Sequence, residues 1–134
     1  MTKFTFSKDE RLSSRKEIEQ LFKEGKSLNS PPLKLIWQKK EFVDVSGPHV
    51  QVMFGVPKKS FPNAVDRNRL KRLMRESYRL SKPDLFEKMN SGQPYNVAFL
   101  FIGKTLTDYA TIQSAMKNAL ERWLKKITTI APTS

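Results

Sequence analysis

Hydrophobic positions recur along this chain at two spacings, one typical of helices and the other typical of strands. In residues 14–24 the spacing is helical, and three apolar side chains share one face: Ile18, Leu21 and Phe22. Ser14 precedes Glu17 by three positions, which is the spacing of a capping box at the start of a helix. Gly25 then suits the end of the helix, because glycine is common just beyond the last turn. The pattern predicts an amphipathic helix over residues 14–24.

Strand-like alternation of apolar and polar positions follows in two segments, residues 33–40 and 49–56. Residues 41–48 between them contain Ser-Gly-Pro, which favours a turn. We therefore expect an antiparallel hairpin with one covered face. Residues 26–32 are expected to be extended, with at most one short strand, because Pro31 and Pro32 exclude a helix.

A second, longer helix is predicted over residues 63–80. Asn63 is a suitable N-cap, and the Asp66 carboxylate lies in the first turn, where negative charge is favourable. Pro83 is expected to end the helix, because proline has no backbone N–H to donate.

The most apolar segment, residues 95–102, predicts a strand at the centre of the sheet. A last helix is expected from about residue 107 to residue 127. Its apolar stripe consists of Ile112, Met116, Ala119, Leu120, Trp123 and Ile127. Together the elements predict an α+β sandwich with one mixed sheet and helices packed on it.

The composition is that of one globular domain. The chain has 134 residues, of which 38% are hydrophobic, and we expect a single domain over residues 1–127 with a flexible tail over residues 128–134. There is no cysteine, which excludes disulfides and thiolate metal sites, and the single histidine, His49, excludes a histidine-rich metal cluster. The sequence has neither a signal-peptide stretch nor an apolar run of the ~18 residues that a membrane span requires. We therefore expect a cytoplasmic protein.

The net charge restricts the possible functions further than the overall composition does. The 25 Lys and Arg residues oppose 13 Asp and Glu residues, which gives a formal net charge of +12. Such a charge favours polyanionic partners, of which nucleic acid is the first candidate and an anionic membrane surface the second. Lysine dispersed over the surface, without any such partner, is the third explanation.

Much of the positive charge lies in residues 58–82, where nine cations oppose only Asp66 and Glu76. The cations are Lys58, Lys59, Arg67, Arg69, Lys71, Arg72, Arg75, Arg79 and Lys82. At ~100° per residue, a single ~140° arc of the helix collects six residues: Arg67, Asn68, Lys71, Arg72, Arg75 and Arg79. The opposite side carries Leu70, Leu73, Met74 and Ser77. We predict one side for the core and the other for phosphates; the alternatives are an ordinary solvated face and a helix lying in a membrane surface.

The same helix carries a sequence found in a known family. Residues 64–76 read A-V-D-R-N-R-L-K-R-L-M-R-E and resemble the signature A-V-x-R-N-R-x-K-R-x-x-R-E of the bacterial ribonuclease P protein component. Other segments resemble the family in order and spacing: residues 6–8, 11–12, 21–26 and 58–59. The resemblance extends over about residues 4–127.

Three departures from the family pattern stand out. Pro57 is found where the family usually has serine, and residues 60–63 form a link that is one residue longer. Ile18 is found where phenylalanine is common, which weakens a stacking role at that position.

The resemblance implies an α-β-β-β-α-β-α sandwich with a mixed four-stranded sheet, in which a left-handed crossover places the helix of residues 63–80. It also implies a monomeric protein that binds ribonuclease P RNA, a large catalytic RNA, in a 1:1 complex and helps it remove the 5′ leader from precursor tRNA. The chemistry would belong to the RNA, with Mg²⁺ held mainly by phosphates. We expect no catalytic or metal-binding side chain in the protein, whose acids include the scattered Asp44, Asp66, Glu76, Asp84 and Asp108.

Two groups of site residues follow from the resemblance. The RNA-binding residues would be Lys58, Lys59, Arg67, Asn68, Arg69, Lys71, Arg72, Arg75 and Arg79. A cleft between the first helix and the sheet would guide the single-stranded leader with Ile18, Phe22, Lys34 and Ile36. Core packing is an equal alternative for Phe22, and His49 has no expected function beyond an exposed strand end.

Three other functions are compatible with a basic helix. A general or ribosome-associated RNA-binding protein would not stimulate tRNA maturation, whereas a stand-alone metal nuclease would cleave RNA without an RNA subunit. A DNA-binding regulator would bind duplex DNA as well as it binds precursor tRNA.

Overall fold

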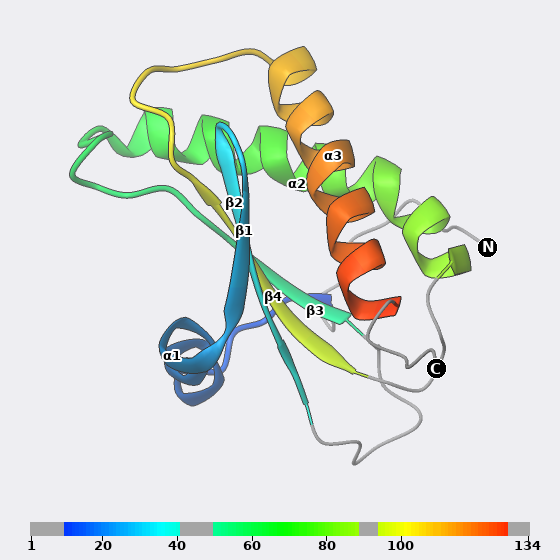
Figure 1. Ribbon diagram of the computed structural model, residues 1–134. Coiled ribbons are helices and arrows are strands. Elements are labelled where there is room, and N and C mark those ends of the chain that lie inside the picture. The colour runs from blue at the N-terminus through cyan, green and yellow to red at the C-terminus, as the bar shows by residue number, and fades with distance from the viewer. Residues whose placement is uncertain (1–9, 41–49, 89–93, 129–134) are drawn as a thin grey trace.

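The structure, a computed structural model, describes residues 10–40, 50–88 and 94–128. The predicted turn at residues 41–48, His49 and residues 129–134 of the predicted tail lie outside these ranges. The elements are α1 (Arg15–Glu24), β1 (Lys26–Ser30), β2 (Leu33–Lys39), β3 (Val50–Gly55), α2 (Ala64–Lys88), β4 (Tyr95–Phe101) and α3 (Tyr109–Thr128) (Figure 1). The expected α-β-β-β-α-β-α order is confirmed.

The four strands form one mixed sheet in the order β1-β2-β4-β3. β2 pairs antiparallel with both β1 and β4, while β3 pairs parallel with β4. The predicted central position of β4 is therefore confirmed. Because β3 and β4 are parallel neighbours, the chain must cross over between them, and α2 makes this crossover.

The predicted hairpin between the strands now named β2 and β3 is wrong. Val97 of β4 faces Trp37 of β2 on one side and Val52 of β3 on the other, so β4 separates the two strands. The hairpin is instead formed by β1 and β2, which are joined through Pro31 and Pro32. The most apolar strand occupies the position that is covered on both faces, where its side chains are buried most completely.

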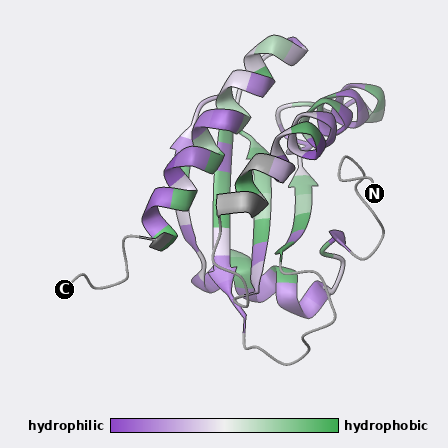
Figure 2. Cartoon of the chain, turned by 90° about the vertical axis from the view of Figure 1, so that its right-hand side faces the viewer, coloured by the Kyte–Doolittle hydropathy of each residue, from purple (hydrophilic) through white to green (hydrophobic). Residues whose placement is uncertain are grey.

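Helices cover both faces of the sheet: α2 and α3 lie on one face and α1 lies on the other (Figure 1). Alternate residues of β2 serve the two layers, because Leu35 and Trp37 pack beneath α2 and α3, whereas Ile36 packs beneath α1. Hydrophobic residues are concentrated along the central strands and alternate with hydrophilic ones along the helices (Figure 2). This pattern is typical of amphipathic helices packed on a sheet.

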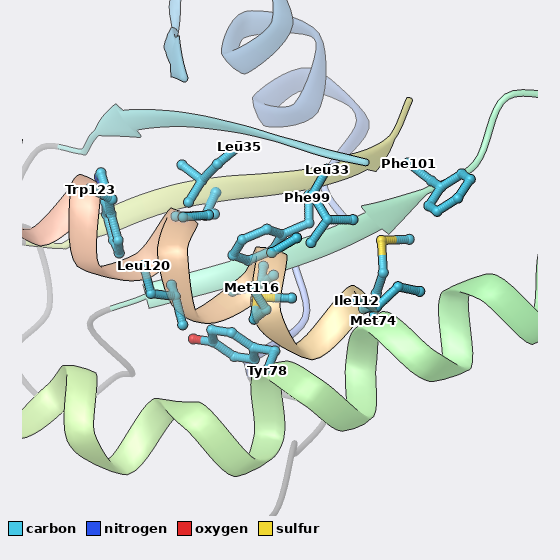
Figure 3. Close-up of a cluster of buried hydrophobic side chains, with 14 of the residues drawn as sticks. Leu33, Leu35, Met74, Tyr78, Phe99, Phe101, Ile112, Met116, Leu120 and Trp123 are labelled. Carbon is cyan, nitrogen blue, oxygen red and sulfur yellow. The ribbon is translucent and has the colours of Figure 1, made fainter. Parts of the chain in front are cut away.

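The larger core lies between the sheet and the layer of α2 and α3 (Figure 3). Trp123 of α3 is buried, with its ring centroid 6.5 Å from that of Trp37 and 5.3 Å from that of Tyr95. The predicted stripe of α3 is confirmed, since five of its residues are buried and the sixth packs against them: Ile112, Met116, Ala119, Leu120, Trp123 and Ile127. From α2, Met74 and Tyr78 point into the same core (Figure 3).

α2 is longer than the sequence suggested. The prediction that Pro83 ends this helix is wrong, because α2 continues to Lys88 with Pro83 inside it. Beyond the proline Leu85 is buried in the core, and before it the Nζ atom of Lys82 lies 2.5 Å from a carboxylate oxygen of Glu10. These contacts on either side of Pro83 stabilise the helical backbone against the loss of one hydrogen bond.

α1 begins and ends as predicted. The side chain of Ser14 accepts a hydrogen bond from the backbone N–H of Glu17 (3.3 Å), and the N–H of Gly25 donates to the carbonyl of Leu21 (2.8 Å). A Cβ atom at Gly25 would lie 2.5 Å from that carbonyl oxygen and 2.9 Å from Ile36. Glycine therefore allows α1 to lead directly into β1 while staying close to the sheet.

Candidate nucleic-acid interface

α2 turns one side toward the core and the other side outward. Its buried residues near the start include Leu70, Met74, Ser77 and Tyr78. On the outward side Asn68, Arg69 and Arg72 are exposed. The predicted division of this helix is confirmed for Leu70, Met74 and Ser77 on the core side and for Asn68 and Arg72 on the cationic side. Arg69 and Tyr78 were not placed on either side by the prediction.

A row of four cations runs between these two sides. Arg67, Lys71, Arg75 and Arg79 are all half-buried. Arg79 forms an ion pair with Glu76. Among the residues that the structure describes, Lys71 and Arg75 have no carboxylate partner. Their charges are therefore not neutralised within the described part of the chain.

Residues 57–62 form the loop that leads from β3 to α2, and two cations are exposed on it. Lys58 and Lys59 lie in a turn in which the N–H of Phe61 donates to the carbonyl of Pro57 (3.1 Å). The side chain of Phe61 is buried, and its ring meets that of Phe101 edge-on at 5.6 Å. The anchored phenylalanine holds both lysines close to the start of α2.

Arg67 differs from the other cations of α2. Its Nη1 atom donates hydrogen bonds to the carbonyl oxygens of Phe61 (2.9 Å) and Pro62 (2.8 Å). The guanidinium group therefore lies against the loop backbone. This contact could not be predicted from the sequence, because the helical position of Arg67 places it in the same row as Lys71 and Arg75.

We call the cations and the amide that surround the outward side of α2 the cationic surface. It consists of Lys58, Lys59, Asn68, Arg69, Lys71, Arg72 and Arg75. Lys82 adds to the charge of the segment but does not belong to this surface, because it is buried against Glu10.

The second predicted site lies where α1 covers the sheet. Ile36 is buried in a small cluster with Leu21, and Ile18 packs half-buried against that cluster. Phe22, by contrast, is 46% exposed, so core packing does not account for it. Lys34 is half-buried and precedes Ile36 by two residues, on the same face of β2. The structure thus brings Ile18 of α1 and Ile36 of β2 together between the helix and the sheet, and it leaves the Phe22 ring accessible.

A polar network that the sequence did not suggest connects α1 to the sheet. Asn96 of β4 is buried and donates through Nδ2 to Oε1 of Glu17 (3.0 Å), which also lies 3.4 Å from Nζ of Lys40. Lys40 in turn donates to the side chain of Gln51 (3.1 Å). The hydrogen bond from Asn96, with Lys40 adding to it, lowers the pKa of Glu17 below its usual value. In the sequence, the feature that could have indicated this network is Asn96, a polar residue inside the most apolar strand.

Neither a metal cluster nor a membrane-spanning helix is found in the described ranges. No group of three or more His, Cys, Asp or Glu side chains there could hold a metal ion. Within the same ranges no helix is long and apolar enough to cross a membrane.

Fold and site together define a small, basic α+β protein whose longest helix presents cations outward, the arrangement expected of a protein with a polyanionic partner. The family model described as Ribonuclease P matches residues 6–128. The chain therefore belongs to the ribonuclease P protein family. Membership makes it a subunit of a ribonuclease of tRNA processing and implies a ribonuclease P RNA partner and a precursor tRNA substrate.

Individual relatives agree with this assignment. The chain is 38% identical over 120 residues to the ribonuclease P protein component of Porphyromonas gingivalis, which covers 89% of this chain and 86% of the relative. It is 46% identical over 103 residues to that of Chlorobium phaeobacteroides, covering 72% and 70%. Among solved structures, the RNase P protein from Thermotoga maritima matches with a TM-score of 0.64 and 26% identity, covering 84% of this chain and 96% of that one. The expected fold, a mixed four-stranded sheet with three helices, is confirmed.

Proposed function

We propose that this chain is the RNA-binding subunit of ribonuclease P, which assists the catalytic RNA in removing the 5′ leader from precursor tRNA. The family membership supports the assignment, and the cationic surface supports the role. The observation that carries the proposal is that Asn68, Arg69 and Arg72 are exposed on the side of α2 opposite its buried residues.

The cationic surface binds phosphates of the RNA. The planar guanidinium group of arginine matches two phosphate oxygens at once, and Lys58 and Lys59 add point charges beside the helix start. Contacts of this kind position the protein on its RNA rather than read its sequence. Their strength depends on salt, because each one releases counterions from the RNA.

The α1 side of the sheet guides the single-stranded leader. An exposed aromatic ring such as that of Phe22 stacks on a base of any identity, and Lys34 attracts the backbone. Ile18 and Ile36 hold α1 on the sheet at this place, since both pack in the cluster between the helix and the sheet.

Catalysis belongs to the RNA subunit, and no protein side chain is catalytic. Mg²⁺, held mainly by RNA phosphates, supplies activation of the attacking water when bound. The donor set of α2 fits this division, because Glu76 is already paired with Arg79 and cations dominate the surface. The protein acts in the cytoplasm as a monomer in a 1:1 complex with its RNA.

Reconstitution tests the proposal. Purified protein is added to bacterial ribonuclease P RNA at low Mg²⁺, and removal of the 5′ leader from precursor tRNA is followed. We expect stimulation by the protein and no cleavage by the protein alone. Binding without stimulation would instead favour a general or ribosome-associated RNA-binding protein, and cleavage without the RNA subunit would favour a nuclease.

A further inference from the structure

Three contacts hold the loop between β3 and α2. The N–H of Phe61 bonds to the carbonyl of Pro57, the Phe61 ring is buried against Phe101, and Arg67 bonds to the carbonyls of Phe61 and Pro62. The first contact lies within the loop and the second lies in the core. The third comes from a side chain of α2 and joins the loop backbone to the cationic helix.

The position of Arg67 explains why its side chain reaches the loop. Side chains of a helix lean toward its N-terminus, so an arginine in the first turn extends back over the residues that precede the helix. The backbone N–H of Arg67 donates to the carbonyl of Asn63 (3.2 Å), which places this residue in the first turn. Its guanidinium group then meets the carbonyl oxygens of Phe61 and Pro62.

We propose that Arg67 is a positioning residue, whose bonds to the carbonyls of Phe61 and Pro62 hold Lys58 and Lys59 in place for RNA. The inference rests on the proposed function and replaces the expectation that Arg67 binds RNA itself. Arg67 contributes to RNA affinity through the two lysines of the loop and not as a phosphate ligand of its own. Arg72, which is exposed on the same helix, contacts phosphate directly.

The first experiment uses the free protein. Hydrogen exchange at the backbone N–H of Phe61 is compared in the wild type, Arg67→Ala and Arg72→Ala. We expect exchange at least about fivefold faster in Arg67→Ala, because local opening of the loop is no longer opposed by the guanidinium group, and unchanged exchange in Arg72→Ala. Unchanged exchange in Arg67→Ala would overturn the proposal. Arg67→Lys keeps the charge without the planar fork. Exchange in this variant is expected to be as fast as in Arg67→Ala, and wild-type exchange would overturn the proposal that the paired guanidinium bonds hold the loop.

The second experiment is a double-mutant cycle with a transcript of ribonuclease P RNA. Arg67→Ala is expected to weaken binding about tenfold in the wild-type chain and less than about twofold in the Lys58→Ala/Lys59→Ala chain, because the residues act as a unit. Arg72→Ala is the control, with an equal loss in both chains. Equal losses for Arg67→Ala in both chains would overturn the proposal and make Arg67 a phosphate ligand.

Different results would contradict the proposed function and the role of Arg67. Loss of the proposed function is visible in the wild type, as absence of stimulated leader removal. The proposal on Arg67 is judged from differences between variants, and the hydrogen-exchange comparison requires no RNA.

Discussion

At the scale of single residues, the arginines of α2 show that helical position does not by itself determine a role. Arg67 bonds to loop carbonyls, Arg79 pairs with Glu76, and Arg72 is exposed. Periodicity gives the direction in which each side chain leaves the helix, and this was enough to predict the core side and the cationic side. It does not give the atom that a long guanidinium side chain finally reaches, because that partner belongs to a loop or to another turn.

Neutralising Glu76 should strengthen RNA binding. In Glu76→Gln the ion pair with Arg79 is lost, so the guanidinium group becomes available to phosphate and the surface gains one net positive charge. We expect an affinity for ribonuclease P RNA about two- to threefold higher, with a steeper dependence of log K on log salt. Filter binding over a salt series measures both. Glu121→Gln, which removes an exposed carboxylate from α3, is the control; an equal gain there would mean that only the net charge matters.

Glu17 gives a pH-dependent prediction. Its pKa is lowered in the folded protein by the Asn96 hydrogen bond and by Lys40, so the charged form stabilises the fold above the usual glutamate value of 4.5 and that stability is lost as the pH falls through the lowered pKa. The free energy of unfolding of Glu17→Gln should therefore lie below that of the wild type at pH 7, and the difference should shrink below pH ~4.5. Urea unfolding between pH 7 and pH 3 measures this difference. With Glu19→Gln, an exposed change on the same helix, we expect little difference at any pH; a Glu17→Gln difference that stays constant down to pH 3 would contradict the assignment.

At the scale of elements, local patterns predicted what local contacts determine. α1, α3 and β4 have the expected places because their caps and apolar spacing lie within the element itself. Strand pairing could not be predicted in the same way. Alternation alone would allow either β1 or β3 beside β2. Which strand pairs with β2 depends on β4, which begins some forty residues after the end of β3.

The end of α2 likewise could not be predicted from the local sequence. Proline predicted a stop at a position where the helix continues, because Leu85 and Lys82 find partners in the core and at Glu10. Glu10 is 72 residues away from Lys82 in the sequence, so no local signal connects the two.

The Lys82 pair gives a prediction at this scale. Lys82→Met removes the ion pair that joins Glu10 to α2, which should lower the free energy of unfolding by about 2–3 kcal/mol. Urea unfolding at pH 7 measures the loss. Lys117→Met, at an exposed position of α3, serves as the control and should change stability by less than about 0.5 kcal/mol. A loss as small as that of the control would show that the pair does not anchor the N-terminal segment.

At the scale of the whole molecule, the sheet separates two helical layers with different tasks. The layer of α2 and α3 contains the larger core and carries the cationic surface, while α1 covers the other face with a smaller cluster and the exposed Phe22. The family could be recognised from the sequence because its signature lies within one helix. The contacts of the loop before that helix and the network at Asn96 could not, since they join residues from separate elements.

The salt dependence of binding to ribonuclease P RNA tests the cationic surface most directly. Two charge-matched variants are compared with the wild type: Lys58→Ala/Arg72→Ala, which removes two cations from the surface, and Lys39→Ala/Lys117→Ala, which removes two exposed lysines elsewhere. We expect the first variant to bind more weakly at every salt concentration, with a slope of log K against log salt reduced by up to about two units. The second variant should keep the wild-type slope. Equal slopes for the two variants would contradict the claim that α2 and its loop bind the RNA.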